Sequence, residues 1–338
     1  MSNDVFLPLL KRVAGGETLD AEQSAQAFGA IMAGDVSETR IAALATAMEV
    51  RRPTVEEIVG AVRAMRGAMK SIEANPYAID LCGTGGDGAK TLNISTASTF
   101  VVAACGVPVA KHGSRGATSL SGTADCLEAL GVNIDVSPAG ASRCLQEAGV
   151  CFLFAQAYHP ALKYAAPVRK ELGFRTIFNL LGPLSNPARV RRQLVGVYDK
   201  SWCVPLAEAL NRLGAEHAWV VHGDGLDEIA TSGPSHVAIL EGGAVTARDI
   251  GPEDAGLSWS PLSALAGGNA VENAAALRRL FDGETGAYRD IVLINSAAAL
   301  IVAGNAGDLR EGVAQAARAI DTGAAKAKLE TLIAVSKA

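Results

Sequence analysis

Apolar side chains recur every three or four positions through the first seventy residues, which is the spacing of one buried face of an α-helix. Ile41, Leu44 and Met48 show the pattern once, and the apolar positions of residues 55–65 show it again. The periodicity predicts a small N-terminal helical domain, residues 1–70, with one apolar face left to cover another surface.

Two helix starts in this region have the sequence of a capping box. Asp20 with Gln23, and Thr54 with Glu57, have the spacing at which each side chain satisfies a backbone N–H group of the first turn. We therefore expect helices to begin directly after Asp20 and after Thr54.

Beyond Asn75–Pro76 the helical period gives way to short, uniformly apolar runs separated by helical stretches. Strands of a parallel sheet have this character because helices cover both of their faces. The pattern predicts an α/β fold for residues 76–338, a larger domain with a mostly parallel central sheet flanked by helices. The expected strands are 78–82, 107–111, 150–155, 193–198 and 218–222, and the expected helices are 95–105, 123–130, 139–148 and the tail from about 273.

Composition narrows the function only a little. The 338 residues are 49% hydrophobic and 19% charged, and the net charge of −5 without a cluster of Lys or Arg argues against a nucleic-acid partner. The six cysteines form no Cys-x-x-Cys pair and are expected to be reduced core residues. The sequence has neither a signal-peptide pattern nor a spanning segment, so we expect a cytoplasmic protein with no membrane partner.

The first expected strand runs into the glycine-rich segment GTGGDGAKTLNIST. Gly83, Gly85 and Gly88 fit the loose spacing of a dinucleotide-binding loop, but such folds need an acidic residue at the end of the next strand. That strand ends instead in Lys111, and Asp87 would repel a pyrophosphate from within the loop. The absence of G-x-x-x-x-G-K-[ST] excludes a P-loop.

The same segment suits a phosphate, because glycine N–H groups can approach an anion closely. Asn93, Ser95 and Thr96 follow where the next helix is expected to begin, so their side chains are predicted to cap it beside the anion. A plain glycine turn followed by an ordinary cap is the alternative interpretation.

Two further strand ends carry ionic side chains. The second strand is followed by KHGSRGATS, which places cations and hydroxyls where ligands of open α/β sheets bind. A later strand ends in HGDGLDE, where the adjacent carboxylates of Asp227 and Glu228 suit Mg²⁺ shared with substrate phosphates. The alternatives are a solvated Lys-His pair and an acidic helix start.

These segments, in this order, resemble the anthranilate phosphoribosyltransferase family over nearly the whole chain. The matching stretches are GTGGD, NIST, KHGSR, SGTAD, APVRKELGFRTIFNLLGPLSNP and HGDGLDEI, with the helical start. GTGGD alone is shared with pyrimidine nucleoside phosphorylases. The resemblance implies a homodimer that transfers the phosphoribosyl group of phosphoribosyl pyrophosphate (PRPP) to the amine of anthranilate, with Mg²⁺, in tryptophan biosynthesis.

The resemblance also assigns roles to residues by their position. The implied catalytic residues are Lys111, His112 and Arg169, and the implied metal ligands are Ser95, Asp227 and Glu228. The residues implied for anthranilate are Gly83, His112, Ser114 and Arg169. The residues implied for PRPP are Gly83, Gly86, Asp87, Thr91, Asn93, Ile94, Ser95, Thr96, Lys111, His112, Gly113, Ser114, Arg115, Gly116, Ala117, Thr118, Ser119 and Thr123.

In the implied reaction the neutral amine attacks C1 of the ribose and pyrophosphate leaves. Mg²⁺ and Lys111 are expected to stabilise the leaving group, His112 to have a lesser proton-transfer or positioning role, and Arg169 to pair with the anthranilate carboxylate. The family usually has Asn where this chain has Ser114, so we expect a weaker acceptor contact or a water in place of the amide.

Two rival functions remain open from the sequence. One is a nucleoside phosphorylase on the same scaffold, and the other is a non-catalytic relative that binds phosphoribosyl groups or nucleic acid. The carboxylates of Asp227 and Glu228 argue against both rival functions, because they suit a substrate that carries magnesium pyrophosphate.

Overall fold

The first seventy residues fold into helices, as the periodicity predicts, in a computed structural model that describes residues 3–116 and 120–338. Both predicted capping boxes are present: Gln23 N donates to Asp20 Oδ1 at 2.8 Å, and Glu57 N donates to Thr54 Oγ1 at 3.3 Å. These helices are α1 (Asn3–Ala14), α2 (Ala21–Ala33), α3 (Glu38–Arg51) and α4 (Val55–Ala68).

A seven-stranded sheet in the order β3-β2-β1-β4-β5-β6-β7 forms the centre of the molecule. The first five strands are parallel, and each overlaps one of the five predicted runs. They are β1 (Ile79–Gly83), β2 (Val109–Gly113), β3 (Val150–Phe154), β4 (Arg192–Gly196) and β5 (His217–Gly223).

Two further strands were not predicted. β6 (Ser235–Glu241) and β7 (Ala244–Ile250) form an antiparallel hairpin on the edge of the sheet beside β5. All but two residues of β7 are exposed, so this strand lacks the apolar run by which the other strands were recognised. The sheet is therefore mixed, with a parallel centre and an antiparallel edge.

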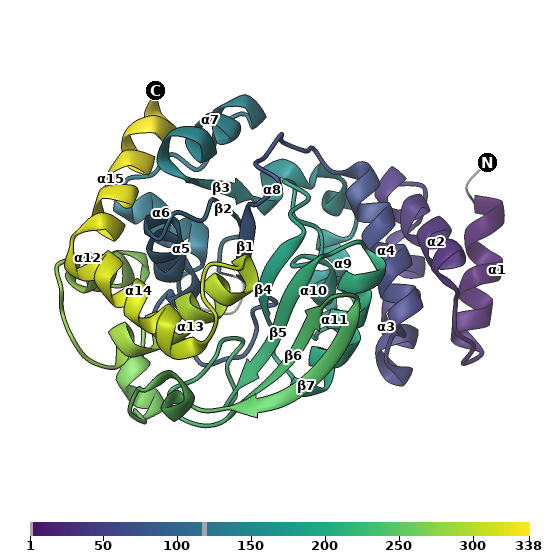
Figure 1. Cartoon of the computed structure of the whole chain (residues 1–338). Helices are drawn as coiled ribbons and strands as arrows, with labels where there is room; N and C mark the ends of the chain where they lie inside the picture. The colour runs from purple at the N-terminus through teal and green to yellow at the C-terminus, as the bar shows by residue number, and fades with distance from the viewer. Residues whose placement is uncertain (1–2, 117–119) are drawn as a thin grey trace.

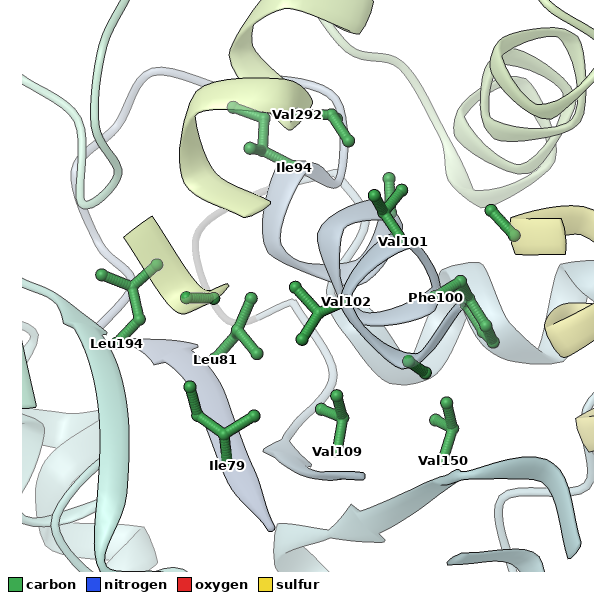
Figure 2. Packing of buried hydrophobic residues seen from close by; sticks show 14 of the residues in the cluster. Ile79, Leu81, Ile94, Phe100, Val101, Val102, Val109, Val150, Leu194 and Val292 are labelled. Carbon is green, nitrogen blue, oxygen red and sulfur yellow. The ribbon is translucent and has the colours of Figure 1, made fainter. Parts of the chain in front are cut away.

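Each face of the sheet is covered by its own hydrophobic core. Because side chains of a strand alternate between faces, Leu194 joins one core and Val195 the other, and Val221 and Val220 divide in the same way. Figure 2 shows the first core, in which helix α5 lies over β1, the strand that carries both Ile79 and Leu81. The second core continues into the N-terminal helices, so the two parts of the chain share buried surface.

The N-terminal helices and the C-terminal helices lie on opposite sides of the sheet (Figure 1). The helices of the α/β part are α5 (Ile94–Ala104), α6 (Thr123–Leu130), α7 (Pro138–Ala148), α8 (Ala155–Tyr158), α9 (Ala166–Leu172), α10 (Phe178–Leu181), α11 (Cys203–Arg212), α12 (Ala270–Phe281), α13 (Ala287–Ala303), α14 (Leu309–Asp321) and α15 (Ala324–Lys337). Within the described residues, no helix combines the length and the hydropathy that a membrane crossing needs.

Candidate active site

The strand order creates a crevice beside β1. The chain moves from β1 outward to β2 and β3, and then returns to form β4 on the other side of β1. Helical connections therefore leave the carboxyl ends of β1 and β4 in opposite directions, which is where open α/β sheets bind ligands. The glycine loop follows β1 directly, so the fold places it at this point.

The glycine loop and the acidic segment after β5 meet in the crevice, although they are far apart in the sequence. Gly85 N donates to Asp227 Oδ2 at 2.7 Å, and Ser95 N donates to Glu228 Oε1 at 3.1 Å. A Cβ atom on Gly83 would lie 2.2 Å from Asp227 Oδ2, so only glycine allows this approach. Two of the three clusters predicted from the sequence are thus brought together.

The glycine loop has a backbone that most residues avoid. Gly85, Gly86, Gly88 and Lys90 have φ between 51° and 79°, in the left-handed region. Thr91 then forms an isolated bridge with Ala266. The loop therefore has a specific conformation, with contacts to Asp227 at one end and to Ala266 at the other, rather than that of a simple turn.

The carboxylates of Asp227 and Glu228 are half-buried next to one another. Burial, followed by the charge of Asp87, raises the pKa of Asp227 to about 7. Burial, followed by the charge of Asp227, raises the pKa of Glu228 to about 8, against the opposing charge of Lys111. A bound cation would relieve this repulsion. The described residues contain no group of three or more His, Cys, Asp or Glu side chains arranged to hold a metal, so the pair would need oxygen ligands from elsewhere.

The predicted capping of α5 is wrong. Asn93 occupies the N-cap position, but its side chain makes no capping hydrogen bond. Asn273 Nδ2 donates to Asn93 Oδ1 at 2.9 Å instead, and Tyr288 Oη donates to its carbonyl oxygen at 3.3 Å. Thr96 Oγ1 donates to Thr123 Oγ1 at 3.2 Å. The side chains of Asn93 and Thr96, which the sequence predicted to cap α5, thus make tertiary contacts instead.

The first turn of α5 is satisfied in another way. The carboxylate of Glu228 accepts from Ser95 N, which a capping side chain would otherwise do. Ile94, the first residue of the helix, is buried in the core and is placed to anchor the turn rather than to contact a ligand by its side chain. An anionic group and a helix N-terminus therefore already lie together here.

Lys111 and His112, in β2, are buried rather than displayed at the surface. Lys111 Nζ donates to the carbonyl oxygen of Leu81 and, at 3.2 Å, to Ser95 Oγ. His112 N donates to Asp80 Oδ1 at 3.1 Å. Asp80 is completely buried and supplies a negative charge close to Lys111. The lysine is therefore a buried cation whose position is fixed by hydrogen bonds to Leu81 and Ser95.

His112 is paired with a second histidine. Its Nε2 lies 3.2 Å from Nε2 of His159, and the ring centroids are 5.0 Å apart. Burial and then His159 lower the pKa of His112 to about 3, and burial lowers the pKa of His159 to about 4. Both rings are neutral at pH 7, which favours a positioning role for His112 over proton transfer.

The loop after β2 is held by Asp125, from the SGTAD segment. The carboxylate accepts from Gly116 N and Gly122 N at 2.9 Å each, and from Arg115 Nη1 at 2.9 Å. Ser114 Oγ donates to the carbonyl oxygen of Arg115 at 3.0 Å. Ala117, Thr118 and Ser119 lie outside the described residues.

Gly113 and Arg169 are the remaining residues of the site predicted from the sequence. A Cβ atom on Gly113 would lie 3.0 Å from Phe152 and 3.2 Å from Thr123, so a larger residue would crowd the strand end. Arg169 is half-buried on α9, and burial lowers the pKa of its guanidinium. It makes no ion pair or side-chain hydrogen bond with any residue that the structure describes, so its donors are available to a ligand.

Three residues of the site were missed from the sequence. Asp80 was placed inside a strand expected to be apolar, Asp125 was quoted only as part of a motif, and His159 was passed over. A carboxylate within an apolar run was a usable signal for Asp80, because buried charges need partners. His159 had none, since only the fold brings it to His112.

Comparison with known proteins agrees with this architecture. A sequence model described as the glycosyl transferase family, a/b domain, matches residues 75–326, and one described as the helical bundle domain of that family matches residues 7–69. An anthranilate phosphoribosyltransferase from Rhodopseudomonas palustris (strain HaA2) is 54% identical over 98% of this chain and 99% of its own length. One from Xanthobacter autotrophicus is 55% identical over 98% of this chain and 97% of its own length.

Solved structures show the same similarity. The anthranilate phosphoribosyltransferase of Thermus thermophilus has a TM-score of 0.94 at 43% identity, over 98% of this chain and 99% of that chain. The enzyme of Saccharomyces cerevisiae, solved in complex with PRPP and Mg, has a TM-score of 0.89 at 26% identity, over 98% of both chains.

A helical bundle joined to an α/β domain, with a glycine loop and a carboxylate pair at the switch point of the sheet, defines a class of glycosyltransferases. The chain belongs to the glycosyl transferase family with these two domains. Within it, the chain belongs with the anthranilate phosphoribosyltransferases.

Proposed function

We propose that this protein transfers the phosphoribosyl group of PRPP to the amine of anthranilate, giving N-(5-phosphoribosyl)anthranilate and pyrophosphate in tryptophan biosynthesis. The observation that carries the proposal is the meeting of the glycine loop, the start of α5 and the pair Asp227–Glu228 in one crevice. The similarity to anthranilate phosphoribosyltransferases over nearly the full length supports the choice of reaction.

PRPP is proposed to bind along the glycine loop and the start of α5, with its charges facing backbone N–H groups. Glycines in the left-handed region allow backbone N–H groups to approach an anion closely, and the end of β2 adds the buried cation Lys111. The side chains proposed as contacts keep the positions given by the resemblance, including Asp87, Asn93, Thr96 and Thr123. The yeast relative solved with PRPP and Mg supports this assignment.

Mg²⁺ fits the carboxylate pair by charge and by donor chemistry. The oxygens of Asp227 and Glu228 are hard ligands, and burial, followed by the charges of neighbouring carboxylates, raises the pKa of both groups. Ser95 N donates to Glu228 Oε1, which brings Ser95 next to the pair. When bound, Mg²⁺ would supply positive charge to the departing pyrophosphate. The pair leaves the other coordination positions to substrate phosphates and water.

The residues of the chain contribute orientation and charge rather than a strong base. An aryl amine is neutral at pH 7 and needs no deprotonation before it attacks C1 of the ribose. Lys111, fixed by Leu81 and Ser95, provides a cation that cannot move away as negative charge builds on the leaving group. His112 is neutral and its ring is held by His159, so it aligns the acceptor side.

Arg169 is proposed to bind the anthranilate carboxylate through its planar fork. Its guanidinium is half-buried and has no partner among the described residues, which is the state expected of a ligand-binding arginine. The hydroxyl of Ser114 is turned toward its own backbone, so it contributes less to the acceptor than an amide would.

The protein is also proposed to be a homodimer that associates through its N-terminal helices. Val5 on α1 and Val50 on α3 are 47% and 83% exposed, although both are large apolar residues. A second copy of the same helices would cover them. We further propose that residues 1–70 act as the dimerisation unit and residues 76–338 as the catalytic unit.

A fluorescence assay tests the function directly. Purified protein, PRPP and Mg²⁺ are mixed with anthranilate, and the loss of anthranilate emission is followed. Loss that requires all three components supports the transferase. If emission is unchanged while calorimetry still shows PRPP binding, the acceptor is a different amine. Phosphorolysis of thymidine or uridine by the same protein would support the nucleoside phosphorylase instead.

A further inference from the structure

Arg175 connects the acceptor side of the crevice to the glycine loop. It lies between α9 and α10, and its Nη2 donates a hydrogen bond to the carbonyl oxygen of Gly86. A Cβ atom on Gly86 would lie 3.3 Å from Arg175 Nε, so the guanidinium rests directly against this part of the loop. The contact spans 89 positions in the sequence.

The bond falls at the middle of the loop, between two points where other segments hold it. One end is held where Gly85 N donates to Asp227, and the other where Gly267 N donates to the carbonyl oxygen of Lys90 at 2.9 Å. Between them lie glycines that have wide conformational freedom. Ordering such a stretch costs conformational entropy, so a hydrogen bond at Gly86 reduces the ordering that a ligand must bring about.

The guanidinium also interacts with two other elements. Its centre lies 4.2 Å from the centroid of the Tyr198 ring, just beyond β4, and its charge acts on the carboxylate of Glu49 in α3. Burial raises the pKa of Glu49, and the charges of Arg52 and then Arg175 oppose that rise. Tyr198 N donates to Thr84 Oγ1 at 3.1 Å, so the stacking partner also holds the beginning of the loop.

We infer that Arg175 is a positioning residue that holds the glycine loop in the conformation that receives PRPP. The inference rests on the proposed function, because it assigns the loop to that substrate. Arg175 comes six residues after Arg169, so one short segment presents one arginine to the acceptor and another to the donor loop. The acceptor segment and the donor loop are thereby linked by a single side chain.

Arginine suits this role better than lysine. A planar guanidinium can stack on Tyr198 and donate in its plane to Gly86 at the same time. A lysine ammonium can reach the carbonyl but cannot stack in the same way. Arg175→Lys should therefore hold the glycine loop in part, and Arg175→Ala should not hold it.

Steady-state kinetics with each substrate varied in turn test the inference. Arg175→Ala should raise the KM for PRPP about tenfold, a factor that corresponds to ~1.4 kcal/mol and lies near the lower end of the range for a hydrogen bond to a charged group. The KM for anthranilate and kcat should change less than about threefold, and Arg175→Lys should fall between wild type and Ala. The matched control is Arg310→Ala, since Arg310 Nη2 also donates to one loop carbonyl, that of Glu253, at 2.8 Å. If Arg175→Ala and the control Arg310→Ala have the same KM for PRPP, the inference is overturned.

Trypsin cleavage after Lys90 gives a second readout that does not need turnover. The bond lies in the glycine loop, and cleavage should be faster in Arg175→Ala than in wild type or Arg310→Ala, with magnesium PRPP protecting all three. Equal cleavage rates would contradict the role. If wild type makes no product, calorimetric PRPP affinities of the same variants decide the inference while the proposed transferase fails separately. If Arg175→Ala melts well below the control, Arg175→Lys carries the comparison.

Discussion

Single side chains divide into those that face the crevice and those that hold them in place. Arg169 belongs to the first group, because its half-buried guanidinium has no partner among the described residues. Asp80 and Asp125 belong to the second, since each carboxylate accepts hydrogen bonds from the backbone of a loop or strand end. Substitutions in the two groups should therefore produce different kinetic signatures.

Replacing Arg169 by Ala should weaken anthranilate binding selectively. The substitution removes a bidentate partner for the carboxylate, and we expect the KM for anthranilate to rise by about tenfold to a hundredfold, with the KM for PRPP changed less than about threefold. Initial rates at saturating PRPP measure the effect. Equal increases in the two KM values would rule out a specific contact with the acceptor.

Removing the charges of Asp227 and Glu228 should change the dependence on magnesium. The double variant Asp227→Asn with Glu228→Gln keeps similar shapes but lacks two anionic ligands, so turnover should fall at least about a hundredfold and the Mg²⁺ concentration for half-maximal rate should rise. A magnesium titration of the initial rate is the measurement. An unchanged magnesium profile would show that the metal binds elsewhere.

The buried histidine pair should make the fold sensitive to acid. The folded-state pKa values of His112 and His159 lie near 3 and 4, below the value of about 6.5 in the unfolded chain, so the unfolded state binds more protons below pH 6.5. Stability should therefore fall as pH falls from about 6.5 toward 4. His159→Gln removes one such group and should reduce the loss between pH 7 and 5 by about 2 kcal/mol. Urea unfolding at both pH values measures it, and identical losses in the two proteins would refute the argument.

At the scale of secondary-structure elements, close packing between helices depends on small residues. Gly60 on α4 faces α2 so closely that a Cβ atom would lie 2.2 Å from the carbonyl oxygen of Ala21. Gly67, on the same helix, has nothing within 4 Å of the corresponding position. The two glycines thus share a helix but differ in surroundings.

Alanine at these two positions should have opposite effects. Gly60→Ala should destabilise the protein by about 1–3 kcal/mol, because α2 and α4 must separate. Gly67→Ala should stabilise it by about 0.5–1 kcal/mol, since alanine loses less entropy in a helix. Urea denaturation of both variants checks the pair, and stabilisation of similar size at both positions would show that helix propensity, not packing, controls the result.

The segments that follow β1, β2 and β5 contact one another at the site. Gly85 N donates to Asp227, Ser95 N donates to Glu228, and Thr96 Oγ1 donates to Thr123 Oγ1. Parallel strands place their carboxyl ends at one edge, so the meeting follows from the direction of the strands.

The whole molecule is proposed to work as a pair of chains. Light scattering after gel filtration should give a mass near 69 kDa, twice the 34.7 kDa of one chain. Val50→Asp, which would place a charge in the proposed contact, should lower the mass toward that of one chain, whereas the exposed Val271→Asp on α12 should not. A mass of one chain at all concentrations for the wild type would contradict the homodimer.

Much of the architecture was predictable because it depends on local chemistry. The capping boxes at Asp20 and Thr54, the apolar strands and the glycine loop are each visible in a few consecutive residues. The hairpin of β6 and β7 was missed because an exposed edge strand has no apolar run. The capping role of Asn93 was wrong because Asn273, 180 positions away in the sequence, donates to the side-chain oxygen that would otherwise cap the helix.

The sequence by itself determined most of the secondary structure, the residues that carry charge at the strand ends and the resemblance to a family of phosphoribosyltransferases. Only the tertiary structure decided which of these charges meet: that Glu228 caps α5, that Lys111 is buried near Asp80, that His112 is neutral beside His159, and that Arg175 contacts the glycine loop. The physical reason is the distance along the chain over which each effect acts. Propensity and periodicity act between neighbours in the chain, whereas burial, pKa and hydrogen bonding across a crevice depend on which distant segments the fold brings together.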